Sequence, residues 1–87
     1  MKVLMRSVDM ICVNTREGVI TPVKFRMTDS RGDTHIVRVQ KVLDQKEEKL
    51  AGNRMIVFRV QSQVFNQERV YEMKYEISTC KWFIYKM

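Results

Sequence analysis

The sequence has few residues that interrupt regular structure and few that carry out catalysis. Its 87 residues include three glycines, one proline, two cysteines and one histidine. So little glycine and proline excludes a fibrous or low-complexity chain. No stretch of apolar residues is as long as the about 20 that a helix needs to cross a bilayer. Lys2 and Arg6 interrupt the first residues of the chain before the apolar core of a signal peptide could form. These absences predict a single small domain over residues 1–87, cytoplasmic and without membrane association.

The shortage of reactive side chains argues against an enzyme. His35 is the one histidine, and no partner spacing supports it as a catalytic base, so it is interpreted as a strand residue near a hairpin. Cys12 and Cys80 lie far apart and match no metal-ligand spacing, so no metal or other cofactor is expected. Two free thiols are the expectation, with one disulfide joining the two ends as the alternative. The glycines form no phosphate-binding or dinucleotide motif.

The sequence does contain a strand pattern. Apolar residues recur mostly with period two, and β-branched and aromatic residues gather in the same stretches. The expected strands cover residues 2–14, 19–28, 34–43, 55–64, 69–77 and 82–86. Arg31-Gly32-Asp33, an adhesion motif elsewhere, is interpreted as a polar hairpin turn. Residues 44–54 are polar and charged and are predicted to form a loop with at most one helical turn.

These elements predict an all-β fold. Antiparallel strands joined by short hairpins leave one apolar face in water unless the sheet curls. We therefore expect a meander of five to six strands that curls into a small, SH3-like, partly open barrel. The aromatic side chains expected to fill it are Phe25, Phe58, Tyr71, Tyr75 and Trp82.

Charge is the main indication of function. The chain has 16 Lys and Arg against 10 Asp and Glu, a net charge of +6, which favours encounter with polyanions. Five basic residues have outward phases, and strands that pair in sequence order would bring them to one wall: Lys24, Arg26, Arg38, Arg59 and Lys74. A basic wall beside exposed aromatic side chains binds nucleic acid in other small barrels. The alternative is a solvated face on which Glu72 and Glu76 form cross-strand pairs with cations.

The last expected strand has four large apolar residues in a row, from Trp82 to Tyr85. Either it closes the barrel with both faces covered, or Phe83 and Tyr85 form a protein interface, for a homodimer or for a strand added by a partner. The first functional hypothesis is thus a non-catalytic binding module that associates with nucleic acid, or with a nucleic-acid-bound protein, through the basic wall. The alternative is a protein-interaction or self-association domain that uses the last strand.

Five stretches also carry a resemblance: residues 21–26, 35–44, 57–60, 70–75 and 81–85. They contain a Pro-x-x-Phe strand, a strand that ends in Val-Leu-Asp, a Phe-Arg-Val strand, a Tyr-Glu-x-x-Tyr strand and a final Trp-Phe. This pattern resembles a family of short bacterial proteins of unknown function, and related segments occur at the end of a polymerase-like DNA-damage protein. The resemblance implies a nucleic-acid or repair-complex role and no catalytic residue. Gln45 stands where the family has Arg-Trp, so the resemblance does not extend to a binding surface there.

Overall fold

The computed structural model describes residues 1–87 as seven strands in one antiparallel sheet. The strands are β1 (Val3–Asn14), β2 (Ile20–Thr28), β3 (Thr34–Arg38), β4 (Lys41–Leu50), β5 (Asn53–Val64), β6 (Gln67–Glu76) and β7 (Lys81–Lys86). Their hydrogen-bonded order is β3-β2-β1-β7-β6-β5-β4. The chain has no helix that is long and apolar enough to cross a membrane.

The sheet consists of two meanders that join where the first strand pairs with the last. β7 pairs with residues 3–8 of β1, whereas β2 pairs with residues 9–14. Beyond the strands, Lys2 and Met87 exchange two backbone hydrogen bonds of 3.0 Å. β1 therefore changes its partner midway, with register shifts between Val3 and Arg6 and between Ile11 and Cys12. Strands bend at such irregularities, which lets β1 turn a corner of the curled sheet.

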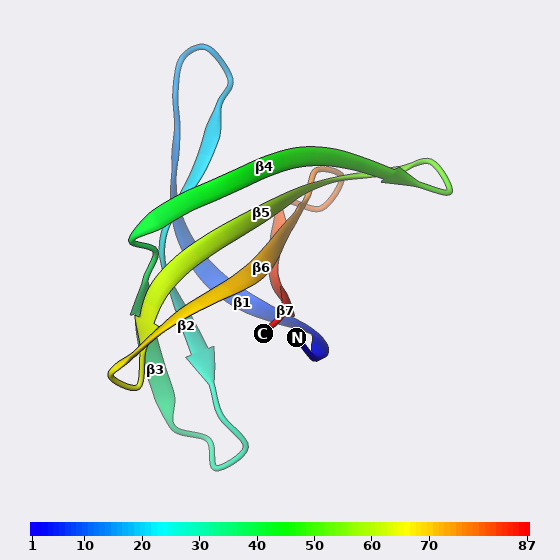
Figure 1. The fold of residues 1–87 in the computed structure, drawn as a ribbon. Helices are drawn as coiled ribbons and strands as arrows, with labels where there is room; N and C mark the ends of the chain where they lie inside the picture. The colour runs from blue at the N-terminus through cyan, green and yellow to red at the C-terminus, as the bar shows by residue number, and fades with distance from the viewer.

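A second corner joins the two outer strands of the sheet, β3 and β4. Only Val39 and Gln40 separate them. Val39 donates its backbone N–H to the carbonyl of Val23 on β2 at 2.8 Å, and Gln40 donates to the carbonyl of Gln61 on β5 at 2.9 Å. Because the chain leaves one end of the sheet and joins the other within two residues, the sheet must curl until its ends meet. The result is a half-barrel in which β4 and β5 cross the β1–β2 hairpin (Figure 1).

The core lies on the inner face of this half-barrel. Ten buried side chains form one apolar cluster: Ile20, Phe25, Val37, Phe58, Val60, Val64, Tyr71, Met73, Trp82 and Ile84. Aromatic contacts link its strands, since the rings of Phe25 and Tyr71 have centroids 6.1 Å apart and those of Phe58 and Trp82 5.1 Å apart. Tyr75 is half-buried and packs against the cluster. The prediction that these five aromatic residues fill the barrel is confirmed.

The all-β class and the curled antiparallel sheet are also confirmed, but the number of strands is seven rather than five to six. The predicted strand 34–43 breaks at residues 39–40, and the predicted loop 44–54 forms most of β4, a turn at Ala51-Gly52 and the start of β5. β4 was missed because it is an outer strand that is exposed along almost its whole length, so its residues do not alternate. Charged side chains are typical of such edge strands, since they discourage pairing with other chains.

One polar pair lies inside the core. The hydroxyl oxygens of Tyr71 and Ser62 are 2.7 Å apart, and both residues are fully buried. Burial raises the pKa of Tyr71 to about 12, although the hydrogen bond with Ser62 acts in the opposite direction. The native state therefore holds the phenol proton more tightly than the unfolded chain, in which tyrosine titrates near 10.

Tyr71 should accordingly make the stability of the protein depend on alkaline pH. Its contribution is fully present below about pH 10 and is lost as the pH rises from about 10 to about 12. Urea denaturation over this range should show a steeper fall in the free energy of unfolding for the wild type than for Tyr71→Phe, which has no phenol to titrate. Parallel declines of the two proteins would contradict the assignment.

Candidate nucleic-acid interface

The five basic residues predicted to share one wall lie on two separate faces. Lys24, Arg26 and Arg38 are on the outer face of β2 and β3, whereas Arg59 and Lys74 are on the outer face of β5 and β6. The expected single wall required strands that pair in sequence order throughout. Instead β1 and β7 lie between the two groups, because the sheet joins through its first and last strands.

Arg59 belongs to a row of alternating charges. The register of β4, β5, β6 and β7 places four residues side by side: Asp44, Arg59, Glu72 and Lys86. Opposite charges that face each other on neighbouring strands stabilise a sheet. Arg59 thus faces an acidic residue on each side, although it takes part in none of the four ion pairs. For this residue the geometry fits the solvated-face interpretation.

Lys74 is buried, although it belongs to the outer face. Only 7% of its side chain is exposed, and its Nζ lies 3.1 Å from Glu48 Oε1. The same Nζ is 3.8 Å from the centroid of the Tyr85 ring. A carboxylate and an aromatic face together stabilise a buried ammonium group. The charge of Lys74 therefore serves the fold and is not presented to a ligand.

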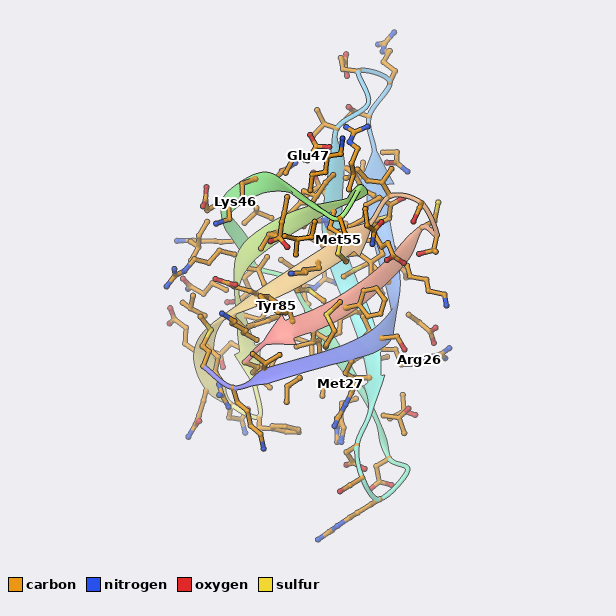
Figure 2. The ribbon with its side chains drawn as sticks, turned by 90° about the vertical axis from the view of Figure 1, so that its right-hand side faces the viewer. Arg26, Met27, Lys46, Glu47, Met55 and Tyr85 are labelled. Atoms are coloured by element: carbon orange, nitrogen blue, oxygen red, sulfur yellow. The ribbon has the colours of Figure 1, made fainter.

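Phe83 and Tyr85 are half-buried on this same face. β7 is paired with β1 on one side and β6 on the other, so its backbone cannot accept a strand from a partner. The ring of Tyr85 also contacts a second cation, with the Nζ of Lys86 4.9 Å from its centroid. Figure 2 shows Tyr85 and Arg26 on different parts of the molecule. Tyr85 is thus not placed to stack bases beside the cations of β2 and β3.

The remaining cations form a surface that we call the basic face, made by Lys24, Arg26 and Arg38 on the outside of β1–β3. One row across the three strands contains Ile11, Lys24 and Arg38, and the next contains Asp9, Arg26 and Ile36. Arg26 donates from Nε and Nη2 to Asp9 Oδ2 at 3.1 and 2.7 Å. Lys24 and Arg38 take part in none of the four ion pairs of the protein.

Lys24 and Arg38 are like charges that face each other directly, an arrangement that costs stability. All other facing charged residues of the sheet are opposite in sign, apart from Lys49 and Arg54. In that pair Arg54 is neutralised by Glu47. The uncompensated pair on the basic face brings no benefit to the fold, which makes this face the candidate site for an anion.

The basic face also contains a shallow hollow of about 360 Å³. Seven residues line it: Asp9, Met10, Ile11, Lys24, Phe25, Arg26 and Ile36. Two of its apolar side chains are open to solvent, with Ile11 57% and Ile36 72% exposed. The face therefore offers apolar contact together with charge. Sequence reasoning missed Asp9, Ile11 and Ile36 as members of the site, because their place depends on which strands lie beside β2.

The histidine of the chain helps to stabilise a turn, and its two cysteines form no disulfide. His35 is in β3, with its Nε2 2.7 Å from Asp29 Oδ2. The Oδ1 of Asp29 accepts the backbone N–H groups of Arg31 and Asp33 and so closes the Arg31-Gly32-Asp33 turn. The hydrogen bond with His35 is the main cause of the lowered pKa of Asp29. Both cysteines are free thiols, and no group of three or more His, Cys, Asp or Glu could hold a metal ion.

Comparison of the chain with family models, with curated proteins and with solved structures found no match. The resemblance to short bacterial proteins therefore stays a prediction. The assignment of the site depends on the geometry of the basic face.

The buried lysine yields a first test of this geometry. Glu48→Ala would leave the ammonium of Lys74 without a carboxylate, so we expect the free energy of unfolding to fall by about 1.5–3 kcal/mol, the range for hydrogen bonds to charged groups. Lys74→Met removes the charge and keeps an apolar side chain, and in that background Glu48→Ala should cost under about 1 kcal/mol. Urea denaturation of the four proteins measures both values, and equal losses in the two backgrounds would show that the pair is not coupled.

The like-charge pair yields a second test. Lys24→Glu would face Arg38 with the opposite charge, so we expect the free energy of unfolding to rise by about 0.5–1 kcal/mol at low ionic strength. The gain should shrink in 1 M salt, where the Debye length is about 3 Å. Lys46→Glu on β4 is the control, since it changes the net charge equally but faces Val57. The interpretation fails if the two variants are equally stable.

Proposed function

We propose that this protein is a non-catalytic binding module that binds nucleic acid through the basic face. The observation that carries the proposal is the pair of Lys24 and Arg38, two facing cations of which neither has a carboxylate partner. In the other like-charge pair of the sheet, Lys49 and Arg54, the arginine is bonded to a carboxylate. The net charge of +6 adds long-range attraction for a polyanion. The resemblance to segments of a DNA-damage protein supports the same class of ligand.

The spacing of the cations favours a chain of phosphates over a single small anion. Lys24 and Arg26 are two residues apart on one strand, which corresponds to about 7 Å, and Arg38 lies one strand away, at about 5 Å. One phosphate could engage only part of this patch, whereas successive phosphates could engage all of it. Small curled antiparallel sheets such as the OB fold bind oligonucleotides on a strand face. We also propose that this curled sheet belongs to the SH3-like type of small barrel.

In this proposal Lys24, Arg26 and Arg38 contact the ligand, and Arg59 and Lys74 do not. Arg59 faces acidic residues on both neighbouring strands, and Lys74 is buried against Glu48. The rival function, a protein interface on β7, has no comparable observation, because the ring of Tyr85 contacts two lysines of its own chain.

Salt-dependent binding tests the proposal. Fluorescence anisotropy with labelled single-stranded DNA, single-stranded RNA and duplex DNA should show the tightest binding at low salt, because bound cations release counterions from the phosphates. The double variant Lys24→Gln/Arg38→Gln should bind more weakly, and its slope of log K against log salt should be smaller by about 1.4 on single strands.

The matched control is Lys46→Gln/Lys49→Gln, which removes the same charge from two exposed residues of β4 that form no ion pair. It should keep the wild-type slope. No detectable binding by the wild type at low ionic strength, or equal losses in the two double variants, would refute the basic face as the site.

A further inference from the structure

The basic face contains an arginine whose guanidinium group is both exposed and held in place. Arg26 directs two donors, Nε and Nη2, at a single carboxylate oxygen of Asp9. Two hydrogen bonds from the edge of a planar group restrict its rotation. The side chain is nevertheless 61% exposed, so the flat surface of the guanidinium remains open to a ligand.

Asp9 stabilises the sheet as the cross-strand partner of Arg26, but it weakens the attraction of this face for phosphates. Its carboxylate repels phosphate groups and neutralises one of the three cations. A face built for phosphate contact alone would bind more tightly without it. A face that needs the guanidinium plane in a fixed orientation, in contrast, needs an acceptor at this position.

The surroundings of Arg26 are apolar as well as charged. Ile36 on β3 lies directly opposite Arg26 on β2 and is 72% exposed. Both line the same hollow as Ile11 and Lys24. Covering an exposed isoleucine removes apolar surface from water, which stabilises a complex. A phosphate cannot supply that contact, whereas the flat face of a nucleobase can.

We infer that the basic face recognises unpaired bases. One base stacks on the guanidinium of Arg26 and covers Ile36, while Lys24 and Arg38 contact the flanking phosphates. Bases in single strands stack on arginine planes in this way, but the bases of a duplex are already stacked on one another and present only their edges. Asp9 is a positioning residue that orients Arg26. This inference rests on the proposed function and narrows its ligand to single-stranded nucleic acid.

The test separates base contact from phosphate contact. Arg26→Lys keeps the charge but replaces the plane with a point charge. We would measure the anisotropy of three labelled probes of equal length: a mixed single strand, the same strand with abasic sites in place of its bases, and a duplex. The wild type should bind the intact strand at least about fivefold more tightly than the abasic strand, the lower end expected for one stacked base. Arg26→Lys should lose this preference and keep its affinity for the abasic strand.

A second variant tests the positioning role. Asp9→Ala removes both the repulsive charge and the acceptor of the Arg26 hydrogen bonds, so its affinity for the abasic strand should rise while its preference for the intact strand falls. Thermal unfolding of both variants should match the wild type within a few degrees, since both positions are exposed.

The outcomes distinguish this inference from the proposed function. If the wild type binds intact and abasic strands equally, or if Arg26→Lys weakens both to the same extent, the face contacts phosphates only. The inference is then overturned and the proposed function stands. If no probe binds at low ionic strength, both fail.

Discussion

The antiparallel pairing of the first strand with the last is the contact on which the rest of this structure depends. Residues 3–8 of β1 lie beside β7, and the backbones of Lys2 and Met87 extend the ladder. Without it, β1–β3 and β4–β7 would be two small open sheets, each with an apolar face in water and little stability of its own. With it, the sheet is long enough for its two ends to meet at Val39 and Gln40 and to enclose the aromatic core.

The same pairing separates the surface charges into two arrangements. On the outside of β4–β7, one row across the four strands alternates carboxylates and cations, and the one buried ammonium, that of Lys74, is bonded to Glu48. On the outside of β1–β3, Lys24 and Arg38 face each other without a carboxylate. The first arrangement stabilises the sheet, whereas the second costs stability and, in the proposed function, is offset by a bound anion. This contrast, rather than the total charge, distinguishes the basic face from the rest of the surface.

Arg26 gives the basic face a character beyond charge. Cations alone would attract any polyanion, but a guanidinium held by Asp9 next to an exposed isoleucine combines a flat stacking surface with apolar area. The exposed isoleucine and the like-charge pair bring no stability to the fold, and in the proposed complex a base and its phosphates would make both favourable. Their coincidence on one face connects the structure to the function that we propose.

The period-two pattern of the sequence by itself determined that this is an all-β chain with Phe25, Phe58, Tyr71 and Trp82 inside, because the side of a strand on which a residue lies depends only on its own neighbours in the chain. β4 was not predicted from the sequence, because an outer strand with water on both faces needs no alternation of apolar and polar residues. The outward phases of Lys24, Arg26 and Arg38 were predictable for the same local reason. Only the tertiary structure decided that Arg59 and Lys74 lie on another face, and that Asp9 and Ile36 adjoin Arg26. Those relations depend on which strands pair, and the strand pair that decides them joins the two ends of the chain.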